Sequence, residues 1–250
     1  MKKSKKKPSL LYRSIKWLVW LFYPKMKLFG SEKLPEGEAV IVANHAQMNG
    51  PISCELYLGD DRYTWCSGEM MDAKQVPDYA FRCFWSHKRG LSKAFFRLLS
   101  YLIAPLAAHI FKNANTIPVY YDQRAILTFK DTVSKLKQGA KVVIFPESDE
   151  KFNHVVYRFH DKFVDVAKLY NSRTGKELSF VPLYVAPELK SLHIGEPIRF
   201  SSQAPIEEER QRICSYLANE ITAIAQSLPL HTVIPFDNIP KSQYNKNTPF

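Results

Sequence analysis

Short, uninterrupted apolar runs alternate with helical patterns through the middle of the chain. Four runs have the length and the β-branched and aromatic content of buried strands: residues 38–44, 116–121, 141–145 and 178–185. Four segments carry apolar side chains at helical spacing: residues 52–58, 124–137, 161–170 and 206–228. The strands at 116–121 and 141–145 flank one of these helices, so we expect them to form a parallel pair. The pattern predicts an α/β fold with a mixed, mostly parallel sheet flanked by helices.

The N-terminal segment has a different pattern. Leu11, Ile15, Leu18 and Phe22 recur at helical spacing, while the charged side chains lie on another side. The longest uncharged run, residues 17–24, is far shorter than the roughly 20 residues needed to cross a bilayer. Its tryptophans and its tyrosine are typical of the headgroup boundary. We therefore expect an amphipathic helix that lies on a membrane surface.

The distribution of charge supports this expectation. The chain of 250 residues has a net charge of +11. Residues 1–33 contain ten Lys or Arg against Glu32 and so carry +9, which leaves +2 for the other 217 residues. A nucleic-acid-binding protein would carry its basic excess on the folded surface, so we expect no nucleic-acid partner. A basic arm on a nearly neutral body fits a membrane-lipid partner, and we expect a peripheral or monotopic protein on the cytoplasmic face of the membrane.

A second strongly apolar segment spans residues 94–111. Its 14 uncharged residues between Arg97 and Lys112 are too few to cross a bilayer. Pro105 and His109 interrupt the apolar character of this segment. The pattern favours a core helix or a re-entrant helix.

Cysteine usage and length set the remaining bounds. The four cysteines show neither C-x-x-C spacing nor a cluster with histidines that completes a metal site, so we expect free thiols and no metal. The length suits one large core. We divide the chain into a basic arm and membrane anchor at residues 1–33, a folded domain at 34–230 and a tail at 231–250. The tail is rich in Pro, Asn and Lys and should wrap the surface or fray.

The candidate chemistry begins at Asn44-His45, which ends the first buried strand. A sheet presents a residue at this position to a cleft, and Gly50-Pro51 shortly afterwards is suited to the start of a helix. Histidine has a pKa near 7 and can therefore act as a general base at neutral pH. His45 is therefore the candidate general base.

Three further segments form a pattern with Ala43-Asn44-His45. They are Ile117-Pro118-Val119-Tyr120, Val143-Ile144-Phe145-Pro146-Glu147-Ser148 and Phe180-Val181-Pro182-Leu183. In order and approximate spacing, the four segments resemble the sequence blocks of the lysophosphatidic-acid and glycerolphosphate acyltransferase family, over roughly residues 28–187. The resemblance implies a glycerol-3-phosphate acyltransferase-like fold. It also implies an O-acyltransferase of phospholipid synthesis or remodelling, which moves a fatty acyl group from acyl-CoA or acyl carrier protein to the hydroxyl of a lysophospholipid such as 1-acyl-glycerol-3-phosphate. The acyl carrier is a co-substrate, and no bound cofactor is implied.

The resemblance assigns catalytic roles to two residues. His45 matches the catalytic histidine, and Glu147, in an intact Phe-Pro-Glu, matches a glutamate that helps to arrange the acceptor. The family's Asp, five residues after the histidine, is replaced by Gly50. The loss is substantial, because an orienting Asp contributes about 10⁴ to the turnover of a serine-protease triad.

Other side chains are available to replace the missing Asp. We expect Asp149 or Glu150 to supply the carboxylate, and Asn49 and Glu55 are further candidates. Only a carboxylate would fully restore the missing charge.

The part of the site that the family uses for the acceptor's phosphate is also altered. Tyr121 aligns with an arginine of the family, and Ser148-Asp149-Glu150 replaces Gly-Thr-Arg. We expect Tyr121 and Ser148 to contact the acceptor. Arg124 and Lys151 are the nearby cations that could reach its phosphate.

Two functions follow from this set of changes. The first is a membrane-surface acyltransferase with a changed acceptor and a relocated carboxylate. The alternative is a catalytically silent relative with the same fold, which binds lipid or a membrane partner. We take acyl transfer as the expected activity.

Overall fold

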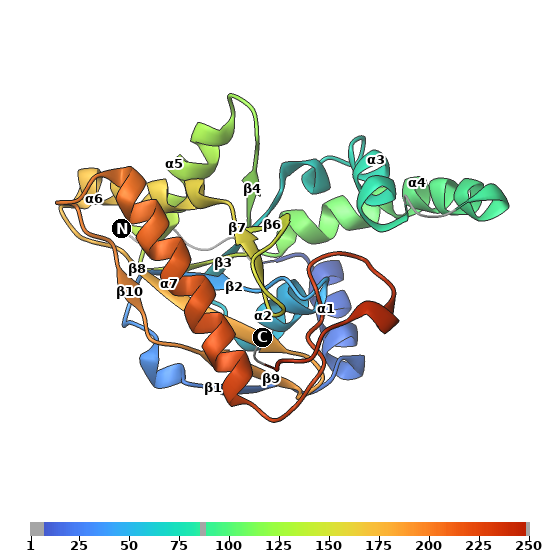
Figure 1. The fold of residues 1–250 in the computed structure, drawn as a ribbon. Helices are drawn as coiled ribbons and strands as arrows, with labels where there is room; N and C mark the ends of the chain where they lie inside the picture. The colour runs from blue at the N-terminus through green and yellow to red at the C-terminus, as the bar shows by residue number, and fades with distance from the viewer. Residues whose placement is uncertain (1–7, 86–88, 249–250) are drawn as a thin grey trace. The chain divides into compact units, whose positions relative to one another are not determined.

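The computed structural model describes residues 8–85 and 89–248 (Figure 1). Contacts along the chain group into two compact units. Unit 1 comprises Met1–Phe22 and Tyr63–Thr128, and unit 2 comprises Tyr23–Arg62 and Phe129–Phe250. The division of the chain at residues 33 and 230 remains a prediction. The five N-terminal lysines, on which the expected basic arm partly depends, lie outside the described residues.

Unit 2 is built on a mainly parallel sheet with the strand order β1-β9-β8-β2-β5 and with β10 paired to β8. The strands are β1 (Lys27–Phe29), β2 (Ala39–Ala43), β5 (Lys141–Ile144), β8 (Ser179–Ala186), β9 (Ser191–Ile194) and β10 (Ile198–Arg199). β2 runs parallel to both of its neighbours, and Ile41 lies opposite Val143 in β5 and Val181 in β8. Both faces of β2, β5 and β8 are buried, so the sequences of these three strands are continuous apolar runs and do not alternate with polar residues.

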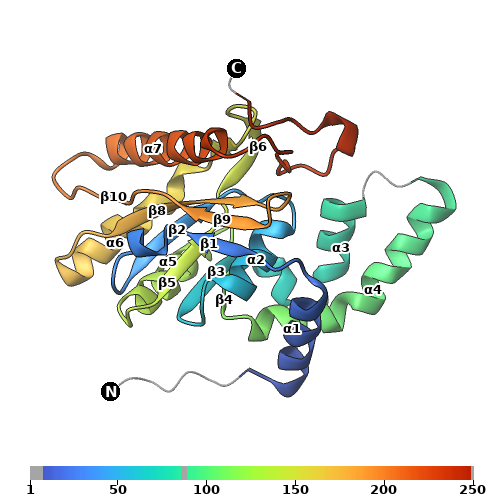
Figure 2. The same ribbon diagram turned by 90° about the horizontal axis from the view of Figure 1, so that it is seen from below.

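Helices pack on this sheet. They include α2 (Asn49–Tyr57), α6 (Asp165–Thr174) and α7 (Ile206–Ser227), with a 3₁₀ turn at Asp161–Val164. Figure 2 shows α7 along one face of the sheet, where it contacts β8 and buries Ile213, Leu217 and Ile221 at helical spacing. Cys54 of α2 packs with Ile41 in a separate buried cluster. The fold is thus mixed α/β, as the hydrophobic pattern predicts.

Unit 1 contains a parallel pair of strands and a group of helices. Its elements are α1 (Leu10–Phe22), β3 (Arg62–Ser67), α3 (Val76–Ala80), α4 (Gly90–Asn113) and β4 (Thr116–Val119). β3 and β4 pair in parallel, with Thr64 opposite Thr116. α5 (Ala125–Leu136) begins at the end of this unit and continues into unit 2.

Most expected elements are confirmed to within a few residues, but two expectations are wrong. The strands at 116–121 and 141–145 do not pair as expected: β4 pairs with β3, and β5 pairs with β2. The segment at 94–111 is longer than expected, because α4 extends over 24 residues. It exposes most of its large side chains, which excludes the core helix, while the re-entrant helix remains a prediction. Its length and composition also make it the one helix within the described residues that is long and apolar enough to cross a membrane.

Two further segments are more ordered than the sequence suggests. Glu147, which none of the expected strands and helices includes, begins β6 (Glu147–Lys151), and β6 forms a hairpin with β7 (Tyr157–Phe159). The tail wraps the surface of unit 2. The Val233 amide donates to the Asn245 carbonyl over 2.9 Å, and the Asn247 side chain donates to the Ala225 carbonyl of α7 over 2.7 Å.

Candidate active site

His45 leaves the sheet at the carboxyl end of β2. The preceding residue, Asn44, fixes this end to β8, because its side-chain oxygen accepts from the Val185 amide over 2.7 Å and its Nδ2 donates to the Val185 carbonyl over 3.2 Å. The carboxyl edge of parallel strands is where open α/β sheets bind their ligands. His45 therefore lies at the edge of the sheet where such folds bind their ligands.

The Glu147 carboxylate holds the backbone of His45. One carboxylate oxygen accepts from the His45 amide over 2.5 Å, and the other accepts from the Tyr157 amide over 3.0 Å. Glu147 is buried, and it follows β5, the strand next to β2. The two residues expected to be catalytic thus meet from positions 102 residues apart, with the glutamate positioning the histidine through its main chain. A direct role of Glu147 in arranging the acceptor remains a prediction.

The imidazole of His45 is oriented by a main-chain oxygen. Its Nδ1 hydrogen-bonds to the Gln47 carbonyl. A carbonyl only accepts hydrogen bonds, so Nδ1 carries the proton of the neutral ring and Nε2 keeps its lone pair. Nε2 bonds to none of the described residues and is not among their buried, unpaired polar atoms, so this lone pair is open to solvent or to a substrate.

An unusual turn brings the Gln47 carbonyl to the ring. Ala46 and Gln47 both have left-handed backbone conformations, with φ of 46° and 54°. Such angles are uncommon for residues with a side chain and are retained only where the surroundings impose them. The Asn49 amide closes the turn by donating to the Ala46 carbonyl over 3.1 Å.

Gly50, which stands where the sequence resemblance led us to look for an Asp, has no room for a side chain. A Cβ at this position would lie 2.5 Å from the carbonyl oxygen of His45 and 2.8 Å from that of Asn44. The Gly50 amide also donates to the His45 carbonyl over 3.0 Å. In this loop the Gln47 carbonyl, and not a side chain at position 50, orients the His45 ring.

The expected replacement carboxylates do not contact the imidazole. Asp149 and Glu150 are exposed on β6, and Glu150 pairs with Arg158 over 3.3 Å. Glu55 pairs instead with the buried Arg62 over 2.5 Å. Asn49 is engaged as well, because its Oδ1 accepts from the Tyr23 hydroxyl over 3.1 Å. Among the described residues, no acid hydrogen-bonds to the ring of His45.

The four expected acceptor-binding residues belong to both units. Tyr121 and Arg124 lie in unit 1, where Tyr121 is exposed and the Arg124 guanidinium bonds both oxygens of Asp122 while it stacks 4.2 Å from the Tyr120 ring centroid. Ser148 and Lys151 lie on β6 in unit 2, and the Ser148 hydroxyl accepts from the Glu150 amide over 3.3 Å. Their contact with an acceptor remains a prediction.

Residues of the tail, which the sequence analysis did not assign to the site, cover part of it. The Phe236 ring meets the His45 ring edge-on at 5.6 Å, and the Phe145 ring lies 5.2 Å from the His45 ring. The Gln47 amide group donates to the Tyr244 hydroxyl over 2.8 Å and to the Asp237 carbonyl over 3.2 Å. No local sequence signal marks the tail residues Phe236, Asp237 and Tyr244, because they contact residues that lie almost 200 positions earlier in the chain.

Burial shifts the titration of both central residues. It lowers the pKa of His45, against the opposing effect of the hydrogen bond to Gln47, so the neutral ring is favoured. Burial raises the pKa of Glu147 to about 7, and the Asp237 carboxylate adds to this rise, while the amides of His45 and Tyr157 oppose it.

The described residues form neither a metal-binding cluster nor a disulfide. The described residues contain no group of three or more His, Cys, Asp or Glu that could hold a metal ion. The four cysteines form no disulfide within the described residues, and burial raises the pKa of the Cys54 and Cys66 thiols to about 12. Such thiols are poor nucleophiles and poor ligands at neutral pH.

Comparison with known proteins gives similarity in structure but not in sequence. The sequence matches no family model and no curated protein. The structure is similar to the crystal structure of the 1-acyl-sn-glycerophosphate (LPA) acyltransferase PlsC from Thermotoga maritima, with a TM-score of 0.48 and 17% sequence identity over 86% of this chain and 79% of that chain. The fold class stated above rests on the strand order and register of this chain.

Proposed function

We propose that the protein is an O-acyltransferase. It moves a fatty acyl group from acyl-CoA or acyl carrier protein to the hydroxyl of a lysophospholipid, such as 1-acyl-glycerol-3-phosphate, at the cytoplasmic face of a membrane. The observation that carries the proposal is the bond from the His45 amide to the Glu147 carboxylate. It joins the two residues that the sequence resemblance selects independently, at the sheet edge where a ligand would bind.

The chemistry follows from the open lone pair of His45. Nε2 takes the proton of the acceptor hydroxyl as the hydroxyl oxygen attacks the thioester carbonyl carbon. The carbon–sulfur bond then breaks, and the imidazolium returns the proton to the departing thiolate. Throughout, the Gln47 carbonyl holds Nδ1–H and keeps Nε2 directed outward. The acyl carrier enters as a co-substrate, and no bound cofactor is required.

The experiment is an acyl-transfer assay with the purified full chain in liposomes. Acyl-CoA and acyl carrier protein are each offered with a panel of lysophospholipids. Several headgroups are needed because positions 121 and 148–150 differ from the resembled pattern where it contacts the acceptor's phosphate, so the acceptor need not be lysophosphatidate. We expect transfer to at least one acceptor, and His45→Ala should lower it by about 10²-fold or more. His160→Ala, at an exposed histidine of the same unit, is the matched control and should leave the rate unchanged.

A second function is favoured by one observation. Phe236 packs on the His45 ring, and no acid among the described residues orients that ring. Both features favour a catalytically silent protein that has the same fold and binds lipid. Equilibrium binding of radiolabelled lysophospholipids separates the two functions. Saturable binding without product formation, for every donor and acceptor pair, would replace the enzymatic proposal with this one.

A further inference from the structure

The α4 helix has its large and small side chains on the wrong sides for a helix in water. Ser100, Ala104 and Ala108 are buried at four-residue spacing, and they are the three buried residues of the helix. Leu91 and Leu102, by contrast, are 92% and 70% exposed. The exposed stripe of large side chains consists of Leu91, Phe95, Leu98, Leu102 and Leu106. A helix on a water-soluble protein normally turns such side chains toward the core.

The small residues of α4 form its contact with the rest of unit 1. Ala104 and Ala108 pack with Val76 and Ala80 of α3 in one buried cluster. Small residues at helix contacts, with large apolar side chains facing outward, are the arrangement of helices packed in lipid. The exposed stripe therefore points to an apolar surrounding and not to water.

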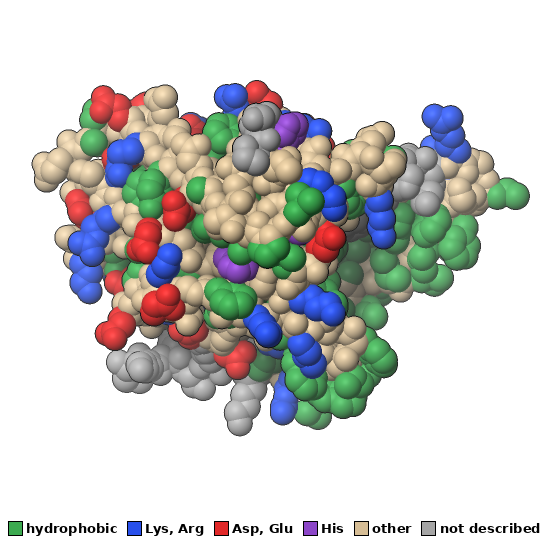
Figure 3. Space-filling model, turned by 60° about the horizontal axis from the view of Figure 1, so that its bottom comes forward, with side chains coloured by type: hydrophobic (Ala, Val, Ile, Leu, Met, Phe, Trp, Pro, Cys, Tyr) green, Lys and Arg blue, Asp and Glu red, His purple; other side chains and the backbone are tan. Residues whose placement is uncertain are grey.

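The first helix adds to the same apolar surface. The residue before α1 ties it to α4, because the Ser9 hydroxyl hydrogen-bonds with His109 over 2.7 Å and the Ser9 amide donates to the Asn113 side chain over 3.0 Å. α1 exposes a further set of large apolar side chains: Leu10, Leu11, Trp17, Leu18, Trp20, Leu21 and Phe22. Figure 3 shows one dense group of hydrophobic side chains over α4 and another over α1. Exposed apolar groups of this size mark an interaction surface.

We propose that α1 and α4 form one lipid-facing surface, with which the protein inserts into a single leaflet of an anionic bilayer. The net charge favours an anionic bilayer over a protein partner, because residues 1–33, the segment that contains α1, carry +9. Trp17, Trp20 and Tyr101 provide the amphipathic rings that favour the headgroup boundary.

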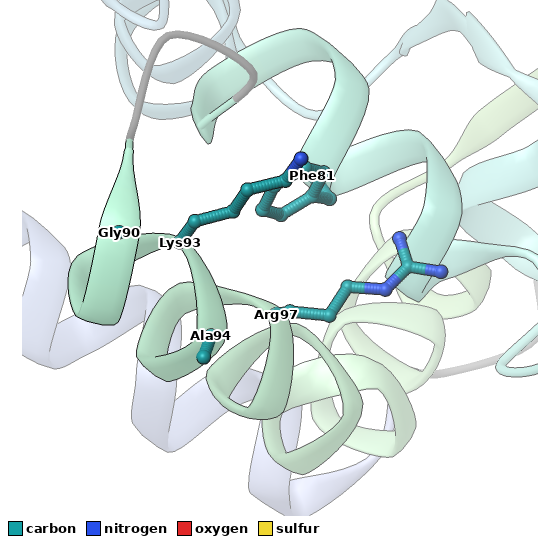
Figure 4. Close-up of a pocket in the computed structure, with 5 residues that line it drawn as sticks. All are labelled: Phe81, Gly90, Lys93, Ala94 and Arg97. Carbon is teal, nitrogen blue, oxygen red and sulfur yellow. The ribbon is translucent and has the colours of Figure 1, made fainter.

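The charged side chains of α4 fit insertion to partial depth. Lys93 and Arg97 extend together from α4 toward Phe81, where they line an open pocket of about 390 Å³ (Figure 4). Arg97 also pairs with Asp78. These groups belong at the depth of the lipid headgroups, while the stripe on the outer side of α4 enters the acyl region.

The same contacts argue against a transmembrane position for α4. At 1.5 Å per residue its 24 residues are long enough to cross the hydrocarbon core. Crossing would, however, take the Arg97–Asp78 pair into hydrocarbon, where charged groups are costly. It would also require separating Ala104 and Ala108 from α3 or burying α3 as well. Insertion into one leaflet keeps these contacts intact.

The test is binding of the full chain to vesicles without any acyl donor, so its outcome does not depend on the proposed acyl transfer. Vesicles of phosphatidylcholine with phosphatidylglycerol are floated at low salt and at about 0.5 M NaCl, where charge attraction is largely screened. The wild-type protein should stay bound at high salt. The variant L98E/L102E, which places two charges in the exposed stripe, should bind at least ten-fold more weakly there.

The control matches the exposure and chemistry of the substituted positions. Leu230 in unit 2 is 69% exposed, and Leu230→Glu should bind like the wild type. Circular dichroism and the thermal midpoint establish that each variant is folded, and both substitutions replace side chains that already face outward. Release of the wild type by salt, or equal binding of L98E/L102E and the wild type, would overturn the proposal, as would equal weakening by Leu230→Glu.

Discussion

His45 keeps two of the three features that a general base of a triad needs. Its main chain is fixed by Glu147, and its Nε2 is open. The third feature, a carboxylate on Nδ1, is replaced by the neutral Gln47 carbonyl. A carbonyl fixes the tautomer but stabilises the imidazolium less than a negative charge does, so the ring should be a weaker base than in a triad.

This weaker base predicts the position of the acidic limb of the pH–rate profile. Burial lowers the pKa of His45 below its usual 6.5, and the imidazolium that forms on acidification cannot accept a proton. We expect kcat/KM to fall as the pH drops, with a midpoint below pH 6.5. The profile is measured with wild type and Glu147→Gln, because Glu147 titrates near pH 7. An acidic limb centred above pH 7 in Glu147→Gln would contradict the assignment.

Glu147 should make the stability of the protein depend on pH. Its pKa rises from 4.5 to about 7 on folding, so between these values the folded protein binds more protons than the unfolded chain. The free energy of unfolding should then fall as the pH rises through this window, by at most on the order of 3 kcal/mol from this residue. Urea unfolding at pH 5 and pH 7.5 measures the change, which should be smaller in Glu147→Gln. An equal change in both proteins would show that other groups cause it.

At the scale of elements, the turn between β2 and α2 determines the chemistry of the site. The left-handed residues Ala46 and Gln47 direct the Gln47 carbonyl to the ring, and Gly50 lets the start of α2 approach the His45 carbonyl. The site is thus organised around a backbone oxygen, and the turn and the glycine depend on each other.

This dependence predicts that position 50 does not tolerate an Asp. In Gly50→Asp or Gly50→Ala the new Cβ would lie 2.5 Å from a backbone oxygen, and the backbone cannot give way without displacing His45. Both variants should lose about 1–3 kcal/mol of stability or more, which is the usual cost of overpacking. Urea unfolding measures this loss, and acyl transfer should fall in both variants. A gain of activity in Gly50→Asp at wild-type stability would refute this view of the turn.

The tail should support the same turn. The Tyr244 hydroxyl accepts from the Gln47 side chain, so Tyr244→Phe removes one of the bonds that hold the residue orienting His45. A hydrogen bond of this kind contributes about 1 kcal/mol, so kcat should fall by roughly five-fold with little change in KM. Tyr216→Phe is the control, since its hydroxyl bonds to the Glu196 carbonyl of the same unit and not to the turn. Equal effects of the two variants would show a general loss of stability.

The elements also show what could be predicted from the sequence. The runs around Ile41, Val143 and Val181 are continuous because both faces of the strands are buried, and they were therefore found. The short strands β1, β9 and β10 have two to four residues and lack such a signal. His45 and Glu147 follow strands and could be selected, whereas Gln47 acts through its main chain, which no side-chain pattern records. Phe236 and Tyr244 reach the site only through tertiary packing.

At the scale of the whole molecule, chemistry and membrane contact fall in different compact units. His45 and Glu147 belong to unit 2, whereas α1 and α4 belong to unit 1. The helical pattern of α4 was predictable, but its inverted exposure was not, because the sequence does not state which side of a helix faces the protein. A change in the apolar stripe should therefore alter access to the substrate without altering the reaction.

This separation predicts a difference between two forms of the acceptor. In detergent micelles the lysophospholipid is available without membrane insertion of the protein. The L98E/L102E variant should then keep kcat/KM within about two-fold of the wild type, because it changes neither the binding of the acceptor at the site nor the chemical step. In vesicles at about 0.5 M NaCl, where attraction to the basic arm is screened, the same variant should be at least ten-fold slower. Glu147→Gln should instead be slower in both assays, because it alters the residue that positions His45. An L98E/L102E variant that lost activity equally in micelles and vesicles would show that the stripe supports the catalytic unit itself.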